Sequence, residues 1–312
     1  MNTLLDGKVA VVTGAGRGVG RAHALHLAAL GARVIVNDLG VARDGAGRTD
    51  GPADDVCQEI RHAGGQCEPN YGDVADEAGS AALIDQAIES FGGLDILVCN
   101  AGIIRERPIH EMSTADWDLI QSVNLRGHFL PCRDASRYWR DRSASTGGSV
   151  DASVILTSSR AGLAGSAGYL GYATSKAAIA TMAVVIARDL EQFGVRANAI
   201  CPRARTRMTV SNPGYSRPTP GSDFDLTAPE NNSPMVGYLA SHLSRGVTGQ
   251  VFVTGADGVE WIQGWVRAGT VAKTGAPFTP EEIHAGASAL FGDSETRPTA
   301  GMGSVYRDDA RT

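Results

Sequence analysis

Short apolar runs alternate along this chain with longer stretches in which apolar residues recur at helical spacing. The run at 8–13, KVAVVT, is apolar and rich in β-branched residues, which is typical of a strand buried on both faces. Residues 21–30 follow with helical periodicity and end at Gly31, a residue suited to closing a helix. The same order repeats along the chain. The sequence predicts strands at 8–13, 33–36, 66–70, 94–99, 153–157, 195–200 and 250–254, and helices at 21–30, 54–63, 77–91, 114–138, 172–193 and 234–243.

Strands that alternate with helices predict a parallel sheet covered by helices on both faces. We therefore expect an α/β protein with a single Rossmann-fold domain at 1–256, built on a doubly wound, seven-stranded parallel sheet. Residues 257–312 form a C-terminal extension. In this extension a helix should begin at Pro280, Trp261 and Trp265 could pack on a neighbouring subunit, and residues after about 293 are expected to be disordered.

Three connecting segments stand out by their composition. Residues 140–151 are polar and small, so we expect a loop that is longer than the connection requires. Glycines at 162, 165 and 168 predict a flexible turn. Residues 203–233 contain four prolines and scattered aromatic residues, and long irregular segments are usually lids, binding loops or disorder. Because this segment follows a predicted strand end, we favour a substrate lid.

Composition narrows the class of partner. Hydrophobic residues make up 43% of the 312 residues and charged residues 20%, which is ordinary for a protein with a substantial core. The net charge of -6 argues against nucleic-acid or anionic membrane surfaces, because both need a basic footprint. The most apolar long stretch, 177–187, is too short to span a bilayer. Small molecules are the expected partners.

Cysteine and histidine give no indication of a disulfide or metal site. The five cysteines are odd in number and scattered, without a Cys-x-x-Cys pair, so we expect no disulfide framework, no zinc site and a reducing, cytoplasmic setting. His23 and His26 lie three apart on a predicted helix, but no further ligand shares their spacing, so no metal is expected.

The glycine-rich turn after the first strand is suited to a dinucleotide. Glycines at 14, 16, 18 and 20 let the backbone turn sharply, and the helix that follows offers free amides and the positive end of its dipole to a diphosphate. Asp38, at the end of the second strand, could accept hydrogen bonds from an adenosine ribose and would repel a 2′-phosphate. Together they favour NAD over NADP. Arg17 is a contrary indication if it faces the same pocket, although it could equally face solvent.

Other chemistry-bearing residues also fall at strand ends. Asp73 and Asn100 each follow a predicted strand, and ligands of such sheets bind beyond the carboxyl ends of the strands. Tyr172 and Lys176 are four apart on a predicted helix, so they share one face, and a nearby ammonium would lower the pKa of the phenol. Asn124 lies within an apolar helix, where it could be catalytic or simply a satisfied core residue.

Four motifs occur in order: Thr13-Gly14-x-x-x-Gly18-x-Gly20, Asn100-Ala101-Gly102, Ser159 thirteen residues before Tyr172, and Tyr172-x-x-x-Lys176. As a set they resemble the short-chain dehydrogenase/reductase family over about residues 6–256. The resemblance implies an NAD-dependent oxidoreductase that interconverts a secondary alcohol and a ketone, commonly as a homodimer or homotetramer. The implied cofactor contacts are Gly14, Arg17, Gly18, Val19, Gly20, Asp38, Asp73, Val74, Asn100, Ala101, Gly102, Tyr172, Lys176, Pro202 and Thr206.

The same resemblance implies four catalytic residues. Tyr172 would take the hydroxyl proton, Ser159 would orient the substrate oxygen, and Lys176 would hold the nicotinamide ribose and lower the pKa of Tyr172. Asn124, on a helix kinked to hold a water, would pass the proton onward. A non-enzymatic NAD-sensing module is the alternative class of protein. Loss of Tyr172, Lys176 or Ser159 would have favoured this alternative, and all three residues are present.

Further motifs resemble one branch of the family, the (3R)-hydroxyacyl-CoA dehydrogenase units of peroxisomal multifunctional enzymes. They are Val36-Asn37-Asp38-Leu39-Gly40, residues 102–107, Asp116-Trp117-Asp118 and Arg126-Gly127. This implies an acyl-CoA or steroid-like substrate, with a hydroxysteroid dehydrogenase or a general ketone or 3-oxoacyl reductase as alternatives. Arg203 in place of a glycine, the large Arg160 and the long 140–151 loop depart from the family and leave the shape of the pocket open.

Overall fold

The computed structural model describes residues 4–42, 44–47, 51–209, 224–265, 267 and 269–291. Its strands are β1 (Val9–Thr13), β2 (Arg33–Asn37), β3 (Cys67–Asn70), β4 (Ile96–Cys99), β5 (Ala152–Thr157), β6 (Val195–Pro202), β7 (Val251–Gly255) and β8 (Gly258–Ile262). Its helices are α1 (Gly18–Ala29), α2 (Gly51–His62), α3 (Glu77–Phe91), α4 (Thr114–Ile120), α5 (Gly127–Thr146), α6 (Arg160–Ala164), α7 (Leu170–Leu190), α8 (Ser233–Ala240), α9 (Pro280–Ala285) and α10 (Ala287–Phe291). Residues to Ile262 form one compact unit, and those from Gln263 form a second.

The sheet has the order β3-β2-β1-β4-β5-β6-β7-β8. Seven strands are parallel, as predicted, and this arrangement is the Rossmann-type fold expected from the sequence. The prediction of only seven strands is wrong, because β8 returns antiparallel along β7 and carries the sheet to Ile262. β8 is an edge strand with mostly exposed side chains, so its residues lack the apolar run by which the other strands were recognised.

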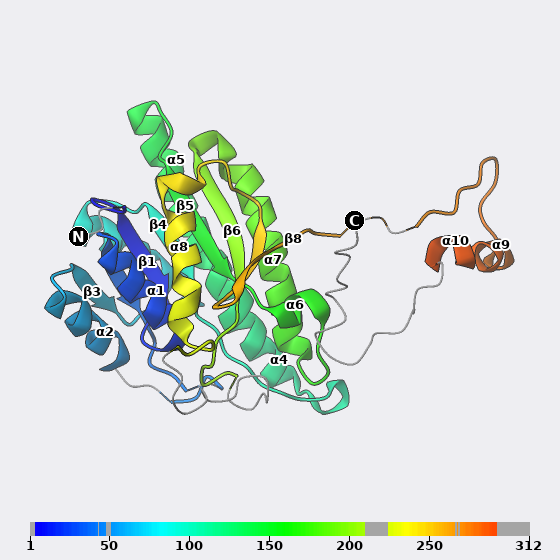
Figure 1. Ribbon diagram of the computed structural model, residues 1–312, viewed down its shortest axis with the longest axis horizontal. Helices are drawn as coiled ribbons and strands as arrows, with labels where there is room; N and C mark the ends of the chain where they lie inside the picture. Colours follow the sequence, from blue (N-terminus) through cyan, green and yellow to red (C-terminus); the bar gives the residue numbers. More distant parts are fainter. Residues whose placement is uncertain are drawn as a thin grey trace. The chain divides into compact units, whose positions relative to one another are not determined.

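Helices α1, α2 and α8 cover one face of the sheet, and α3, α5 and α7 cover the other (Figure 1). The side chains of each strand alternate between these layers. Val9 and Val11 enter the core beneath α3, α5 and α7, whereas Ala10 and Val12 enter the core beneath α1, α2 and α8. Every residue of β1, β4 and β5 is buried, which explains why these strands read as continuous apolar runs.

Two segments predicted as irregular are helical. The loop expected at 140–151 is wrong up to Thr146, because α5 continues until Gly147 adopts a left-handed conformation with φ of 69°. Arg142 on this extra length donates to the Asp95 carboxylate at 3.2 Å, which fastens the helix to the start of β4. The flexible turn expected around Gly162 contains α6, whose first turn is capped by the Ser159 side chain.

One helical segment of the described residues, 170–193, is long and apolar enough to cross a membrane by length and composition alone. The stretch 177–187 was expected to be too short to span a bilayer, but the helical segment that contains it is long enough. The segment consists of α7 and a 3-10 turn at Glu191–Phe193, and α7 lies along β5 and β6. Its apolar character serves the layer that covers the sheet, which is a common property of core helices.

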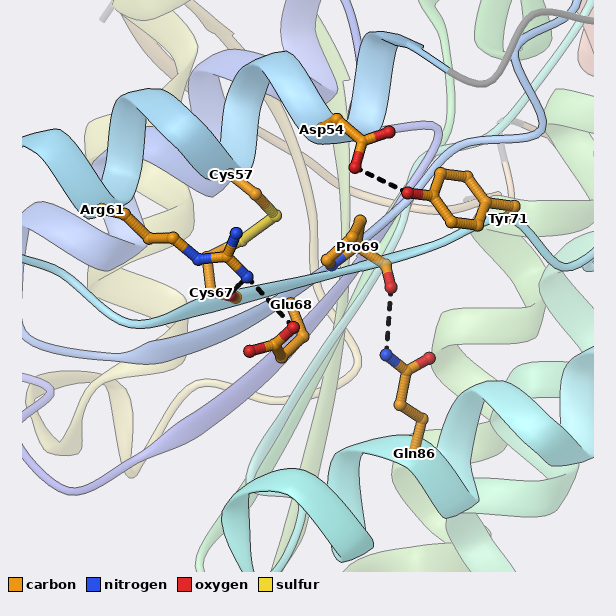
Figure 2. The surroundings of a disulfide bond; sticks show 8 residues. All are labelled: Asp54, Cys57, Arg61, Cys67, Glu68, Pro69, Tyr71 and Gln86. Atoms are coloured by element: carbon orange, nitrogen blue, oxygen red, sulfur yellow. Dashed lines mark hydrogen bonds and ion pairs between the residues drawn. A yellow bond between two sulfur atoms is a disulfide. The ribbon is translucent and has the colours of Figure 1, made fainter.

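A disulfide joins Cys57 on α2 to Cys67 at the start of β3, so the expectation of no disulfide is wrong (Figure 2). The turn between α2 and β3 folds back tightly and brings the two Cα atoms to 5.3 Å, within the range a disulfide needs. Arg61 from the same helix donates to the Cys67 carbonyl at 2.6 Å and pairs with Glu68 (Figure 2). The cysteines therefore no longer support a cytoplasmic location, which stays a prediction.

The second unit contains the predicted helix that begins at Pro280. Thr279 and Glu282 form a reciprocal capping box at the start of α9, and Lys273 pairs with Glu282. Residues 210–223 of the predicted lid and the end of the chain after about 293 lie outside the described residues.

His23 on α1 is completely buried between the helices of one layer. Its Nδ1 lies 2.9 Å from the hydroxyl oxygen of Ser233 at the start of α8. Burial, with a smaller effect of neighbouring His26, lowers the pKa of His23 to about 3. The folded protein therefore keeps this ring neutral where the unfolded chain protonates it.

We expect acid to weaken the fold through His23. Below the ordinary pKa of 6.5, His23 binds a proton in the unfolded chain, whereas in the folded protein it stays neutral down to about pH 3. The free energy of unfolding should therefore decrease as the pH is lowered across this interval, by roughly 1.4 kcal/mol per pH unit for this one group. Urea unfolding at several pH values gives the free energy of unfolding as a function of pH. The slope of this free energy against pH should be flatter by about that amount in His23→Gln. His62→Gln, on the exposed side of α2, is the control and should keep the original slope; an unchanged slope in His23→Gln would contradict the assignment.

Candidate functional site

The glycine turn after β1 is shaped by its contact with the end of β4. Gly14 has a φ of 61°, and a Cβ at this position would lie 2.7 Å from the Cα of Ala101. A Cβ on Gly20 would lie 2.3 Å from the Gly14 carbonyl oxygen and 2.4 Å from the Asn100 amide nitrogen. Both positions therefore need glycine, and the sequence-predicted Gly14, Gly20, Asn100 and Ala101 are brought together.

Asn100 and Thr13 bind the two strand ends to each other. The Asn100 side chain donates to the carbonyl oxygens of Thr13 and Gly14, both at 3.1 Å. The Thr13 hydroxyl accepts from the backbone amides of Asn100 and Ala101 at 2.9 and 3.1 Å. Thr13 is a supporting residue, and the motif in which it stands did not indicate this role.

The turn leads directly into α1, whose first turn holds Val19. Arg17, the residue before this helix, makes no capping hydrogen bond with its side chain, and the first turn carries no acidic residue. The amides at this end of a twelve-residue helix thus suit an anionic group such as a diphosphate. This is the observation by which the turn fits a dinucleotide.

Asp38 is oriented by two backbone amides. Its carboxylate accepts from Gly16 at 2.8 Å and from Gly40 at 2.7 Å. The family motif leaves position 16 variable, but a Cβ on Gly16 would lie 2.8 Å from the Asp38 carboxylate. An ionised carboxylate has about four acceptor sites, so these two bonds leave capacity for ribose hydroxyls.

Positive charge also gathers near Asp38. Burial and the neighbouring Arg17 lower the pKa of Arg207, and Asp38 acts in the opposite direction, so the three charged groups lie close together. Thr206 reaches towards the glycine turn, since a Cβ on Gly18 would be 3.4 Å from its methyl group. The contrary indication from Arg17 is therefore reinforced by Arg207, a charge that the sequence motifs did not indicate.

Asp73 and Val74 differ in their surroundings. Asp73 is exposed and accepts from the Ala75 amide at 2.8 Å, which shapes the turn before α3. Val74 is 6% exposed and belongs to the core beneath α3, α5 and α7. The turn is tied to β2, because the Asn37 side chain donates to the Gly72 carbonyl at 2.9 Å.

Asn124 lies in a π-helical segment, Gln121–Arg126, that interrupts α4 and α5. Its carbonyl oxygen accepts from the Ile103 amide at 2.8 Å, and its NH₂ group donates to the Ile103 carbonyl and to the Ser175 hydroxyl, both at 3.1 Å. Ser175 in turn donates to the Tyr172 carbonyl. The side chain of Asn124 thus clamps the segment after Gly102 onto the helix that carries Tyr172. Ser175, at the centre of this link, was missed.

Lys176 is 2% exposed, and its ammonium donates to the Thr157 carbonyl at 2.7 Å. The ammonium lies 5.7 Å from the centre of the Tyr172 ring, as the predicted helical spacing required. Burial lowers the pKa of Lys176 to about 8, while the Cys201 and Cys99 thiols act in the opposite direction. A Cβ on Gly102 would lie 3.6 Å from this ammonium, which places Gly102 in the same site.

Ser159 follows β5 and faces the same edge of the sheet. Its hydroxyl oxygen accepts from the Ala161 amide at 3.2 Å, so its own hydrogen is not used in that bond. The preceding Ser158 is buried and donates to the Lys176 carbonyl at 2.6 Å, which anchors α7. Ser158 is a second supporting residue that the motif did not indicate. Pro202 ends β6 beside Thr254 of β7.

Arg203, one of the departures from the family, is held by the β7–β8 hairpin. Its guanidinium pairs with Asp257 at 2.6 Å and with Glu260 at 3.2 Å, and it therefore fastens the β7–β8 hairpin. The Arg160 Nε is buried, and the charge of Arg160 acts on Cys201 of β6. Arg203 therefore supports the added strand.

The loop after β4 contributes a separate charged cavity of about 390 Å³, lined by Asp44, Ile104, Arg105, Glu106, Arg107 and Asp116. None of the predicted catalytic residues lines it. Within the described part of the chain, no three His, Cys, Asp or Glu side chains are grouped closely enough to hold a metal ion.

The family defined by this fold and these motifs is the short chain dehydrogenases, which match residues 8–213. The chain belongs to this family, and it is an alcohol oxidoreductase. The family uses a nicotinamide cofactor, NAD or NADP.

Particular relatives are close over most of the chain. Hydroxyacyl-CoA dehydrogenase ChsB1 of Mycobacterium tuberculosis is 44% identical over 256 residues, which are 80% of this chain and 78% of that protein. Peroxisomal multifunctional enzyme type 2 of Mus musculus is 37% identical over 89% of this chain but only 36% of its own length. A short chain dehydrogenase from Mycobacterium avium has a crystal structure that matches with a TM-score of 0.82 and 42% identity, over 95% of this chain and 98% of that one.

Gly20→Ala should destabilise the protein, because its Cβ would collide with the Gly14 carbonyl and the Asn100 amide. Overpacking of this kind costs roughly 1–3 kcal/mol of unfolding free energy, measurable by urea denaturation. Gly148→Ala is the matched control, since a Cβ there meets nothing within 4 Å. Equal stability of the two variants would show that the close approach is not required.

Proposed function

We propose that this protein is an NAD-dependent 3-hydroxyacyl-CoA dehydrogenase. The observation that carries the reaction is the buried Lys176 ammonium, 5.7 Å from the Tyr172 ring, at the strand edge that Ser159 also occupies. The substrate class is supported by the name of the mycobacterial hydroxyacyl-CoA dehydrogenase and by the peroxisomal multifunctional enzymes.

In the proposed reaction Tyr172 accepts the proton of the substrate hydroxyl. The Lys176 ammonium favours the ionised phenol that this step needs, because opposite charges stabilise each other strongly where water is excluded. Ser159 donates to the substrate oxygen and orients it. The nicotinamide ring of the bound cofactor supplies the acceptor for the hydride.

Asn124 has a positioning role in this scheme. Its amide is engaged with Ile103 and Ser175, so it holds two segments of the site in register. The expectation that Asn124 passes the proton onward through a water stays a prediction, and its side-chain contacts support the positioning role.

We infer NAD as the cofactor from Asp38. A carboxylate fixed by Gly16 and Gly40 favours ribose hydroxyls and repels a 2′-phosphate. Arg17 and Arg207 act against this preference, so the selectivity depends on the balance of three charges. Diphosphate contacts from Gly14 to Gly20 and nicotinamide contacts from Thr206 complete the proposed cofactor site. We propose that the enzyme is a homodimer or homotetramer.

The deciding experiment measures NADH formation with a panel of (3R)- and (3S)-hydroxyacyl-CoAs of increasing chain length, hydroxysteroids, and simple secondary alcohols. We expect kcat/KM to be highest for hydroxyacyl-CoAs. The free acids of the same chains are the control for recognition of the CoA group. Higher kcat/KM for hydroxysteroids would reassign the substrate while leaving the chemistry intact.

Tyr172→Phe should bind NAD almost normally and lose turnover by about 10²–10⁴-fold, the usual contribution of a positioned acid–base group. Cofactor affinity is measured by fluorescence titration and turnover with the best substrate of the panel. Tyr169→Phe is the matched control, because its ring lies edge-on to Tyr172 at 6.5 Å but is not assigned to the proton. Near-normal turnover of Tyr172→Phe would refute the assignment.

Asp38→Ala should weaken the preference for NAD over NADP by at least about tenfold, since one lost charge interaction is worth on the order of 1.4 kcal/mol. The measurement is the ratio of kcat/KM for the two cofactors. Asp55→Ala removes the same charge from an exposed position of α2 and should leave the ratio unchanged. An unaltered ratio in Asp38→Ala would mean that Arg17 and Arg207 dominate the choice.

A further inference from the structure

Asp225 is a partly buried carboxylate that neither the family motifs nor the proposed reaction uses. It pairs with the guanidinium of Arg205, the residue directly before Thr206. The same carboxylate accepts from the Thr227 amide at 2.9 Å and from the Thr227 hydroxyl at 2.7 Å. The side chains of Arg205 and Asp225 are 29% and 24% exposed, so solvent screens this pair less than a pair on the open surface. One carboxylate therefore joins the stretch that carries Thr206 to the stretch that leads to α8.

The backbones of these two stretches are also bonded to each other. The Arg205 amide donates to the Thr227 carbonyl at 2.7 Å. The hydrogen bonds from Thr227 to the Asp225 side chain form a local turn, as aspartates commonly do, and this turn orients the Thr227 carbonyl. Asp225 thus holds Arg205 twice, directly through the ion pair and indirectly through Thr227.

The stretch that carries Asp225 is fastened to the sheet. The Asn231 side chain donates to the Asp225 carbonyl at 2.8 Å. The next residue, Asn232, is completely buried, and its side-chain oxygen accepts from the Arg203 amide at 3.1 Å and from the Thr254 hydroxyl of β7 at 2.8 Å. Because these contacts reach β7 and the end of β6, Asp225 holds Arg205 in a fixed position relative to the sheet.

Thr206 lies in a short turn that follows Arg205. The Thr206 amide donates to the Thr209 hydroxyl at 2.8 Å, and that hydroxyl donates to the Ala204 carbonyl at 2.8 Å. The Thr206 hydroxyl oxygen accepts from the Met208 amide at 3.2 Å, a bond that does not use the hydrogen of the hydroxyl. Since the turn is closed by its own hydrogen bonds, its place in the site depends on how it is held from outside, and Arg205 is held by Asp225.

This turn lies beside the glycine turn that suits a diphosphate. A Cβ on Gly18 would lie 3.4 Å from the methyl carbon of Thr206. Thr206 is therefore close to the first residue of α1. A displacement of Arg205 would move Thr206 relative to Gly18, and with it the hydroxyl to which the nicotinamide contact is assigned.

We propose that Asp225 is a positioning residue for the cofactor: through Arg205 and Thr227 it holds Thr206 beside the glycine turn, in place for the nicotinamide amide. The proposal rests on the proposed function, in which Thr206 contacts the nicotinamide. The hydrogen bonds from Thr227, followed by the charge of Arg205, lower the pKa of Asp225, so the carboxylate is ionised at neutral pH.

Asp225→Ala tests the proposal by removing both holds on Arg205. We expect the dissociation constant for NADH to rise about tenfold, the change that corresponds to one lost hydrogen bond to the cofactor. ADP-ribose contains the adenosine, the diphosphate and the second ribose but no nicotinamide, so its dissociation constant should not change. Both ligands are titrated by calorimetry. A general loosening of the site would weaken both ligands by the same factor.

Glu68→Gln is the matched control, because it breaks a different ion pair, with Arg61 beside the start of β3, and should alter neither dissociation constant. An unchanged dissociation constant for NADH in folded Asp225→Ala, or equal losses of affinity for NADH and ADP-ribose, would overturn the proposal.

Thr206→Val tests the route by which Asp225 acts. This variant retains a methyl group beside Gly18 and removes the hydroxyl. Asp225→Ala should therefore weaken NADH binding much less in a Thr206→Val background than in the unaltered protein. The same loss of about tenfold in both backgrounds would show that Asp225 does not act through Thr206, and the proposal would fail.

A crystal structure of the unaltered protein with NADH provides the test if Asp225→Ala does not fold. We expect the Arg205–Asp225 pair to be intact and the Thr206 hydroxyl to lie within hydrogen-bonding distance of the nicotinamide amide. A bound nicotinamide without that contact, or a broken ion pair, would contradict the proposal. The titrations need no substrate, so they also separate the two claims. If no substrate of the panel is turned over but Asp225→Ala selectively weakens NADH binding, the proposed function fails and the positioning role stands.

Discussion

Lys176 is 2% exposed, so its ammonium must find oxygen acceptors inside the protein, and one of them is the Thr157 carbonyl at the end of β5. Much of the local structure follows from this requirement. β5 must end at Thr157 for the carbonyl to be presented, and Ser158 must donate to the Lys176 backbone so that α7 lies against that end. A buried cation stabilises a neighbouring phenolate far more than an exposed one would, because the surrounding dielectric constant is low.

The sequence predicted those parts of the site that depend on local spacing. Tyr172 and Lys176 share a face because they are four residues apart on a continuous helix, and the glycine turn, Asp38, Asn100 and Ser159 meet because each follows a parallel strand. α3 was predicted with its observed bounds, since Asp76 caps it and Gly92 closes it in a left-handed conformation. Features of this kind depend on residues that are close together in the sequence, so the sequence alone predicts them.

The rest depended on contacts between distant segments. The family resemblance implied a kinked helix at Asn124, but no local pattern indicated that the amide would clamp Ile103 or that the irregularity would be a π-helical segment. The Cys57–Cys67 bond arises because α2 and β3 fold back on each other, and the spacing of ten residues is not typical of a recognisable framework. The length of α5 was missed for a similar reason, since its last turns are exposed and polar and are fastened to β4 through Asp95.

Arg203 shows how a departure from the family can be explained by the fold. A long cation after β6 would narrow the pocket if it extended over the site, but its guanidinium pairs with Asp257 and Glu260 on the β7–β8 hairpin. Gly255 permits this path, because a Cβ there would lie 2.9 Å from the Arg203 Nε. The arginine and the added strand therefore explain each other. The β7–β8 turn and β8 supply the two carboxylates that a partly buried guanidinium requires, and the guanidinium holds an edge strand that has little apolar burial of its own.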